Sequence, residues 1–280
     1  MKILKGAEVS AKIKEQVTQM MEGLEGPAPK LAIVRVGEKP DDMSYERGAV
    51  KKMENFGLRV QTYVFPEQIS DSDFKAEFSA INRDPDVSGI LLLRPLPKQI
   101  AETDIEKMID PEKDLDGISP ANIAKVFAGD KTGFAPCTAE AVIEVLKANE
   151  IDMTGKNVTI VGRSMVVGRP LSMLMLKENA TVTICHTKTE YLKKECSRAD
   201  ILISAAGQAG LITGDMVKEG AVVVDVAVNR RADGPLCGDV VFEEAAGRAS
   251  YITPVPGGVG PLTRAMLMKN TLYAAVIHGK

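Results

Sequence analysis

The segment DDMSYERGAVKKMENFG, residues 41–57, places a tyrosine where a helix could set an amine beside it. In a helix Tyr45 lies one turn before Ala49, and Lys51 and Lys52 follow just beyond. A lysine one turn after a tyrosine would indicate proton transfer, because an amine in a dry pocket can have its pKa lowered into that role. Alanine cannot titrate, so position 49 indicates the wall of a pocket instead.

A glycine-rich turn in VTIVGRSMVVGRP, residues 158–170, predicts a phosphate-binding site. A predicted strand ends at Gly162, and a helix is expected to begin near Val167. Glycine at the strand end lets a cofactor approach the backbone, and the helix N-terminus offers amides to a pyrophosphate. The spacing from Gly162 through Ser164 to Gly168 differs from the usual dinucleotide fingerprint. A tight strand-to-helix turn without a ligand is therefore the alternative interpretation.

The next predicted strand favours NADP over NAD as the cofactor. Sheets that bind NAD usually end this strand with an acid, about 20 residues after the glycines, which holds the ribose hydroxyls. Here the strand ends in TICHTKT, with His186, Thr187 and Lys188 and no acid. Arg163, in the glycine turn, could fork onto the additional phosphate of NADP. The alternative is that Arg163 and Lys188 are ordinary surface charges.

Two further loops carry residues suited to binding a flat heterocycle. In EKDLDG, residues 112–117, either Asp114 or Asp116 could cap the following helix or accept hydrogen bonds from a ring with adjacent N–H groups. The loop TPVPGGVGP, residues 253–261, is too rich in proline and glycine for a strand or helix. It could present backbone groups to a ligand or simply join two elements. Cys137 has no nearby base in the sequence, so we interpret it as structural.

The elements that must position these residues alternate between short apolar strands and amphipathic helices. Such alternation predicts parallel sheets with crossover helices. The pattern is interrupted by the polar segment 110–122 and then resumes with four strands typical of a doubly wound nucleotide-binding sheet. We expect two α/β domains with a cleft between them. The expected helices cover residues 10–24, 41–56, 120–127, 138–149 and 261–277.

Composition excludes several classes of protein. The chain has 280 residues, 45% of them hydrophobic, and a formal net charge of −3, which gives no support for nucleic-acid binding. The four cysteines include no C-x-x-C pair and the two histidines lie far apart, so we expect neither a metal site nor a disulfide framework. No apolar run is long enough for a signal peptide or a membrane span. We predict a cytoplasmic protein without a membrane partner.

Several motifs together resemble one family. VGEKP with Tyr45, GILLLRPLP, PEKDLDG, PCT, VGRSMVVGRP, GDVVF and ITPVPGGVGPLT occur in family order from about residue 30 to 265. The family is that of the bifunctional methylenetetrahydrofolate dehydrogenase/methenyltetrahydrofolate cyclohydrolases. The resemblance implies a folate-binding catalytic domain over residues 1–140 and a Rossmann-like NADP-binding domain over residues 141–261. It also implies a C-terminal helix, 262–280, that packs back on the first domain, and a homodimer.

The resemblance also assigns roles to individual residues. Tyr45 is expected to stack on the aminobenzoyl part of folate, and Asp116 is expected to hold the pterin ring. The remainder of the folate pocket would be lined by Leu93, Pro256, Gly257 and Gly258. The residues expected to contact the cofactor are Gly162, Arg163, Ser164, Gly168, Thr187 and Val228.

The sequence departs from the family pattern at the positions that carry proton chemistry. The family motif Y-x-x-x-K has Ala49 in place of the catalytic lysine, and the motif V-Q-L-P-L-P has Leu93 in place of the glutamine that bonds to that lysine. Removing the lysine alone would leave a buried glutamine without its hydrogen-bond partner, which costs about 1–3 kcal/mol of stability. Replacing both residues by apolar groups can be nearly neutral. The two changes therefore look like a paired replacement. Smaller departures occur at Asp42, Ala139 and Ala227.

These departures affect the two family reactions differently. Hydride transfer mainly requires two rings to be held face to face. Opening the methenyl bridge needs a positioned acid–base group, which typically contributes about 10²–10⁴-fold. We therefore predict a dehydrogenase with weak or absent cyclohydrolase activity. One alternative is that Lys52, about one turn past Ala49, reaches back and replaces the missing lysine. Another is a folate- or nucleotide-binding protein without turnover.

Overall fold

The computed structural model describes residues 1–24, 26–230 and 234–277, and the chain divides into two compact units. The three-stranded unit contains Ile13–Ala135 and Arg264–Lys280, and the six-stranded unit contains Met1–Lys12 and Pro136–Thr263. Helices α1 (Gly6–Glu22) and α10 (Gly260–Ile277) contribute residues to both units. The two-unit α/β architecture expected from the sequence is therefore present.

The N-terminus differs from the expected division of the chain. Residues 1–140 were expected to form the first domain, but the structure places the first twelve residues with the six-stranded sheet. The reason is β1 (Lys2–Ile3), which pairs in parallel with β11 (Tyr251–Ile252) at the edge of that sheet. A strand of two residues carries no readable alternation of polar and apolar side chains, so the sequence pattern could not reveal it.

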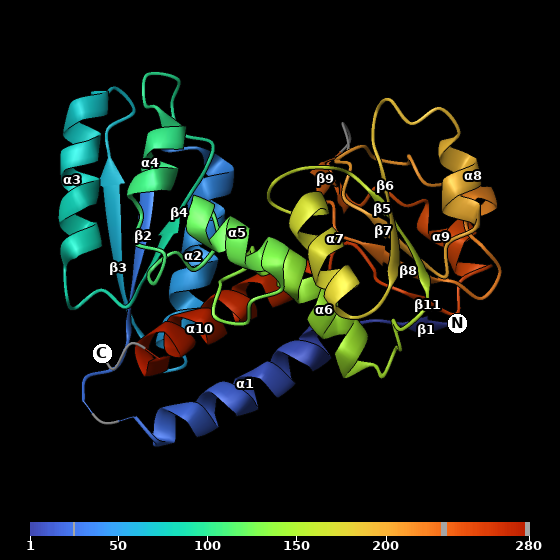
Figure 1. Cartoon of the computed structure of the whole chain (residues 1–280), viewed down its shortest axis with the longest axis horizontal. Coiled ribbons are helices and arrows are strands. Elements are labelled where there is room, and N and C mark those ends of the chain that lie inside the picture. The colour runs from blue at the N-terminus through green and yellow to red at the C-terminus, as the bar shows by residue number, and fades with distance from the viewer. Residues whose placement is uncertain (25, 231–233, 278–280) are drawn as a thin grey trace. The chain divides into compact units, whose positions relative to one another are not determined.

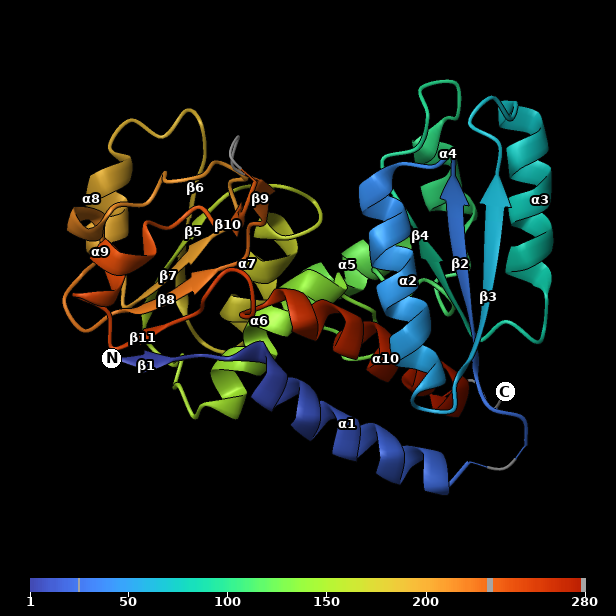
Figure 2. The same ribbon diagram turned by 180° about the vertical axis from the view of Figure 1, so that it is seen from behind.

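The three-stranded unit is a parallel sheet in the order β3-β2-β4 with helices on both faces. Its elements are β2 (Lys30–Val36), α2 (Pro40–Glu54), β3 (Arg59–Phe65), α3 (Asp71–Arg83), β4 (Gly89–Leu92), α4 (Glu102–Met108) and α5 (Pro120–Ala128). Figures 1 and 2 show α2 on one face of the sheet and α3 and α4 on the other. Phe74 and Phe78 of α3 stack with ring centroids 6.0 Å apart in the core beneath the sheet.

Helix α2 carries the tyrosine and begins and ends as its sequence predicts. Pro40 occupies its first turn, where the missing N–H costs nothing. Acidic residues fill its first turn and lysines its last turn, which complements the helix dipole. Its buried face contains Ala49 and Met53, which are both 0% exposed, whereas Val50 is only partly buried.

The six-stranded unit is a parallel sheet in the order β1-β11-β8-β7-β5-β6. Its central strands are β5 (Asn157–Val161), β6 (Thr181–Cys185), β7 (Ile201–Ser204) and β8 (Val222–Asp225). The other elements are α6 (Cys137–Ala148), α7 (Gly168–Lys177), α8 (Leu192–Ser197), the 3-10 helix η1 (Gly214–Met216), the antiparallel pair β9 (Asn229–Arg230) and β10 (Leu236–Cys237), and α9 (Phe242–Ala246). Helices α6 and α7 cover one face and α8 and α9 the other (Figures 1 and 2). This is the doubly wound arrangement predicted for nucleotide binding.

Two features of the described residues bear on the class of protein. None of the helices in these ranges combines the length and apolar character that crossing a bilayer requires. Within the same residues, no group of three or more histidine, cysteine, aspartate or glutamate side chains is arranged to hold a metal ion.

Candidate functional site

In the three-stranded unit, three residues of α2 form one face with the tyrosine. Tyr45, Gly48 and Lys52 are separated by three and four residues, so they follow one another along one side of the helix. Arg264 of α10 lies against this face, with its Cζ 5.9 Å from the centroid of the Tyr45 ring. A Cβ atom at position 48 would overlap the Arg264 Nη1. Glycine at position 48 therefore makes room for the guanidinium.

Lys52 is the partly buried amine on this face. Burial lowers the pKa of the Lys52 ammonium, and the positive charge of Arg264 lowers it further. Lys51, by contrast, is exposed and lines a shallow hollow with Arg47 and Glu54 on another side of α2. The structure thus distinguishes the two adjacent lysines, and only Lys52 shares the side of the helix that carries Tyr45.

Position 49 is sealed inside the unit. The Ala49 side chain is 0% exposed and lies on the buried side of α2 together with Met53. Leu93, at the family's glutamine position, comes directly after β4 and is partly buried. The next residue, Arg94, turns toward α4 and forms ion pairs with Glu102 at 3.2 Å and Glu106 at 3.0 Å. Both positions to which the resemblance assigns the family's acid–base pair are therefore apolar here.

The loop EKDLDG separates its two aspartates by role. Asp114 is buried and accepts hydrogen bonds from Ile118 N at 3.0 Å, Ser119 N at 2.7 Å and Asn122 Nδ2 at 2.9 Å. Asp114 thus holds the start of α5, where Ser119 is the N-cap. The sequence left open which of the two aspartates caps the helix and which binds a ligand. In the structure Asp114 has the capping role. Asp116, which is partly buried, stays the predicted pterin contact.

Helix α10 also fixes this loop. Asn270 donates its side-chain amide to Leu115 O at 3.2 Å, and Leu115 packs on β4 where Gly89 has no side chain. Tyr273, one turn further along α10, meets Phe134 edge to face with ring centroids 6.0 Å apart. The same helix therefore supports both the tyrosine face of α2 and the backbone next to Asp116.

In the six-stranded unit, the glycine turn after β5 is tightly built. Gly162 has φ of 131°, and a Cβ there would overlap Ala205 O. A Cβ at Gly168 would in turn overlap Gly162 O, so both glycines are required by close backbone contact. Ser164 accepts a hydrogen bond from Val167 N at 3.1 Å and so closes the turn before α7. The turn itself explains the glycines, and the amino end of α7 provides the amides that a phosphate would need.

The two threonine hydroxyl groups in the turn after β6 have different surroundings. His186 N donates to Thr189 Oγ1 at 2.8 Å, so the Thr189 hydroxyl is used inside the turn. Lys188 N donates to His186 Nδ1 at 3.1 Å, which leaves the hydrogen of a neutral imidazole on Nε2. Thr187 and Lys188 are exposed. This is consistent with Thr187, not Thr189, as the hydroxyl predicted for the cofactor phosphate.

Sequence reasoning missed a buried carboxylate that organises this edge of the sheet. Asp239 is 0% exposed and accepts hydrogen bonds from Ser204 Oγ at 2.8 Å, Ala206 N at 2.8 Å, Gln208 N at 2.7 Å and Asn229 Nδ2 at 2.9 Å. It therefore ties the loop after β7 to the loop after β8. The only available signal was its place in the motif GDVVF, which gave no role to the aspartate.

Asp225, at the end of β8, is a second buried carboxylate beside the first. It accepts hydrogen bonds from Asp239 N at 3.2 Å and Val240 N at 2.8 Å. Burial raises the pKa of Asp225 to about 6, and the neighbouring charge of Asp239 adds to the rise. Asp225 N donates to Thr253 Oγ1 at 2.7 Å, which attaches the loop that contains Pro256, Gly257 and Gly258 to β8.

The predicted residues of the six-stranded unit gather at one edge of its sheet. The glycine turn follows β5, Thr187 follows β6, and Val228, which is 59% exposed, follows β8. The loop with Pro256 follows β11, and Gly257 O accepts a hydrogen bond from Gly6 N at 2.9 Å. These are the carboxyl ends of parallel strands, where ligands bind in open α/β sheets.

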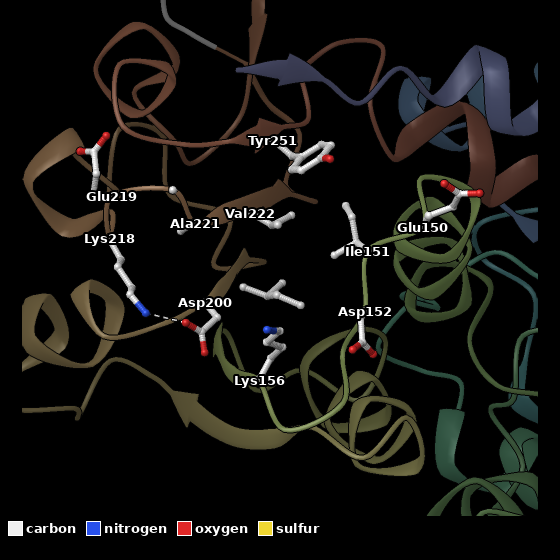
Figure 3. Close-up of a pocket in the computed structure, with 12 residues that line it drawn as sticks. Glu150, Ile151, Asp152, Lys156, Asp200, Lys218, Glu219, Ala221, Val222 and Tyr251 are labelled. Carbon is white, nitrogen blue, oxygen red and sulfur yellow. Dashed lines mark hydrogen bonds and ion pairs between the residues drawn. The ribbon is translucent and has the colours of Figure 1, made fainter.

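A separate pocket lies at the amino ends of the same strands (Figure 3). Its volume is about 370 Å³, and Lys156, Asp200 and Ala221, which line it, immediately precede β5, β7 and β8. Asp200 forms an ion pair with Lys218 at 2.5 Å, drawn as a dashed line in Figure 3. Because this is the opposite edge from the glycine turn, the pocket does not belong to the candidate site.

Family models match most of the chain. The model for tetrahydrofolate dehydrogenase/cyclohydrolase, catalytic domain, matches residues 4–116. The model for tetrahydrofolate dehydrogenase/cyclohydrolase, NAD(P)-binding domain, matches residues 136–278. The two matches fall on the two α/β parts of the chain in the expected order.

Individual relatives and solved structures agree over nearly the whole length. The chain is 48% identical over 278 residues to the bifunctional protein FolD of Clostridioides difficile, covering 99% of this chain and 97% of that protein. The crystal structure of the bifunctional enzyme FolD from Campylobacter jejuni is 42% identical, with a TM-score of 0.97 over 99% of both chains. The FolD structure from Trypanosoma brucei, complexed with NADP cofactor and inhibitor, is 33% identical with a TM-score of 0.94, covering 99% of this chain and 98% of that one.

Proposed function

We propose that this chain, which belongs to the tetrahydrofolate dehydrogenase/cyclohydrolase family, oxidises 5,10-methylenetetrahydrofolate with NADP but has lost most of the family's cyclohydrolase activity. Membership in this family makes the chain an NADP-dependent methylenetetrahydrofolate dehydrogenase of one-carbon metabolism. The single observation that carries the loss of the second activity is Ala49, a fully buried methyl group at the position of the catalytic lysine.

The residues at the carboxyl ends of the strands in the six-stranded sheet suit the binding of a dinucleotide. Gly162 brings backbone close to the end of β5, Ser164 closes the turn, and the amino end of α7 faces the same loop. We propose that Arg163 and Thr187 hold the additional phosphate of NADP, and that Gly168 and Val228 complete the binding surface. When bound, NADP supplies the nicotinamide ring that accepts the hydride. The protein's part in this step is placement, which needs no titrating side chain.

The residues of the three-stranded unit fit a folate ring system. We propose that Tyr45 stacks on its aminobenzoyl part, that Asp116 accepts hydrogen bonds from the pterin, and that Leu93 forms an apolar wall. The neighbouring carboxylate has a structural role, because Asp114 accepts three hydrogen bonds that hold α5. Pro256, Gly257 and Gly258 are also proposed to contact the folate.

The cyclohydrolase step lacks its acid–base group in this arrangement. Water must add to the methenyl carbon, and protons must then move between the water and a folate nitrogen. Ala49 has no proton to give or accept, and Leu93 cannot orient one. We therefore expect hydrolysis slower by about 10²–10⁴-fold than in a family member with the lysine, with dehydrogenation retained.

The deciding experiment measures both activities on one preparation. Methylenetetrahydrofolate and NADP are mixed with the enzyme, and NADPH and methenyltetrahydrofolate are followed together. The expected result is NADPH formation with accumulation of the methenyl product. Hydrolysis of methenyltetrahydrofolate as fast as it forms would reject the proposed loss. Folate binding without any NADPH would instead indicate a binding protein without turnover.

A second candidate is a bifunctional enzyme in which Lys52 replaces the missing lysine. The observation in its favour is that Lys52 is partly buried on the same side of α2 as Tyr45, with a lowered pKa. In this case Lys52→Ala abolishes hydrolysis of methenyltetrahydrofolate while folate binding persists. Lys51→Ala is the matched control, because it removes a lysine from the adjacent, exposed position. Unchanged hydrolysis in Lys52→Ala dismisses this candidate.

We also propose that the enzyme works in the cytoplasm as a homodimer, as the family resemblance implies. The functional division would follow residues 1–140 and 141–261, with the C-terminal helix returning to the folate-binding part. Size-exclusion chromatography coupled to light scattering measures the molar mass in solution. A homodimer should give about twice the 30.1 kDa mass of one chain.

A further inference from the structure

Two cationic side chains lie along the side of α2 that carries Tyr45 in the three-stranded unit. The Arg264 guanidinium lies 5.9 Å from the ring centroid, and Lys52 follows two turns along the same side of α2. Both side chains are partly buried. The charge of Arg264 is close enough to disfavour the charged form of Lys52. Like charges brought together in this way repel, and an anion placed between them relieves the repulsion.

The fold gives up stability to hold Arg264 in this place. Gly48 lies inside α2, where glycine is less stable than alanine by about 0.5–1 kcal/mol. Glycine leaves room for the guanidinium in its present position, where a Cβ would overlap its Nη1. The charges of Arg264 and Lys52 together give this spot a positive potential.

The proposed substrate carries an anion close to the ring that is proposed to stack on the tyrosine. In folate, the aminobenzoyl ring is joined through an amide directly to glutamate, so the α-carboxylate lies only a few bonds from the ring. The Arg264 guanidinium lies over the Tyr45 ring with its Cζ 5.9 Å from the centroid, and we infer that a carboxylate so near a stacked aminobenzoyl ring can reach it. Arginine stays charged at all working pH values and can bind a carboxylate with two parallel hydrogen bonds.

We propose that Arg264 and Lys52 bind the glutamyl carboxylates of folate and so position the substrate from its tail. This inference rests on the proposed function, because the stacking of the aminobenzoyl ring on Tyr45 belongs to it. The chemical class recognised is an aryl amide of an acidic amino acid. Neither side chain takes part in hydride transfer; both act on affinity for the substrate.

The test compares two substrates that differ only in the tail. Methylenetetrahydrofolate carries the glutamate, whereas the corresponding pteroate, used here and below as its uncharged primary amide, has neither the glutamate nor any carboxylate. The wild-type enzyme is expected to have a KM about 10–100-fold lower for the folate. Arg264→Met and Lys52→Met are each expected to raise the KM for the folate about 10-fold. Their KM for the pteroate, their kcat and their KM for NADP are expected to stay unchanged.

Matched controls separate tail recognition from general loss of charge or fold. Lys51→Met and Arg47→Met remove cations from the same helix on the side that bears the shallow hollow, so they should change neither KM. Arg264→Lys keeps a charge without the fork and should lie between wild type and Arg264→Met. Arg264→Met raising both KM values equally, or changing neither, would overturn the proposal.

Binding measurements decide the proposal independently of turnover. The dissociation constants of tetrahydrofolate and tetrahydropteroate are measured by calorimetry for the wild type and Arg264→Met. The preference for the glutamate-bearing ligand should disappear in the variant. If the wild-type protein forms no NADPH from either substrate, the proposed function fails alone, and the ratio of dissociation constants still supports or rejects the role of Arg264.

Discussion

Asn122 donates its side-chain amide to Asp114, with Nδ2 2.9 Å from Oδ2, and both side chains are buried. The same carboxylate accepts two backbone N–H groups at the start of α5. Two aspartates in one short loop are therefore chemically alike but structurally distinct: Asp114 holds the loop, and Asp116 is the one proposed to meet the ligand.

Substitution of the two aspartates should separate stability from binding. Asp114→Ala leaves the amides of Ile118, Ser119 and Asn122 without their acceptor, so we expect a loss of at least about 1–3 kcal/mol in the free energy of unfolding. Asp116→Ala, at a more exposed position, should cost less stability than Asp114→Ala but raise the KM for methylenetetrahydrofolate. Urea denaturation and initial-rate kinetics on both variants check this. A large loss of stability in Asp116→Ala would contradict the assignment.

Restoring the family's polar pair should restore hydrolysis. The double variant Ala49→Lys, Leu93→Gln is expected to gain cyclohydrolase activity, because the amine then has a hydrogen-bonding partner. Ala49→Lys alone should gain less and lose stability, since it buries an amine among apolar side chains. The measurement is the decay of methenyltetrahydrofolate, with dehydrogenase activity as the internal control. No gain in the double variant would mean that more than these two residues separates the activities.

Gly48 and Arg264 should be energetically coupled. In the Arg264→Met background, Gly48→Ala should stabilise the protein by about 0.5–1 kcal/mol, as expected for glycine to alanine inside a helix. In the wild-type background the new Cβ meets the guanidinium, so Gly48→Ala should be neutral or destabilising. A double-mutant cycle of unfolding free energies measures the difference. Additive effects would show that Arg264 moves aside without cost.

Asp225 should make stability depend on pH in the opposite sense from an ordinary ion-paired carboxylate. Its pKa is raised from 3.8 to about 6 by burial, so the folded state binds its proton more tightly than the unfolded state. Its contribution to stability is therefore greatest below about pH 3.8 and is lost as the pH rises through about 6. The carboxyl carbon of Asp225 observed by NMR should titrate near pH 6. A midpoint near 4 would refute the effect of burial.

Arg163 should determine the preference for NADP. Arg163→Ala removes the guanidinium proposed to bind the additional phosphate, so the KM for NADP should rise about 10–100-fold, with a much smaller change for NAD. Arg198→Ala is a suitable control in the same unit, because Arg198 is an exposed arginine paired with Glu195. Equal losses with NADP and NAD would point to a role in the shape of the turn.

Long periodic segments were predictable from sequence, and short ones were not. The helix expected over 41–56 is observed as Pro40–Glu54, and the last helix, expected over 261–277, is observed as Gly260–Ile277. Helix α4 (Glu102–Met108) went unpredicted, because seven mostly polar residues with one buried side chain show no clear periodicity. The two-residue strands β1 and β11 escaped for the same reason.

Site residues were predictable where a motif is local and not where the partner is distant in sequence. The glycine turn is recognisable because Gly162, Ser164 and Gly168 lie within seven residues. Arg264 was not recognisable, since its partners Tyr45 and Gly48 lie near the other end of the chain. The choice between Asp114 and Asp116 likewise depended on Asn122, whose side chain reaches back to the loop only once α5 has formed.

The two-residue strand at the margin of the six-stranded sheet has a consequence for solubility. Lys2 and Ile3 cover the hydrogen-bonding side of Tyr251 and Ile252, and Leu4, which is 0% exposed, anchors them. Deleting residues 1–4 would expose the edge of β11 and leave an apolar cavity where Leu4 was buried. An exposed edge strand next to an apolar surface promotes aggregation. Such a truncated protein should aggregate, although it keeps every residue of the proposed site.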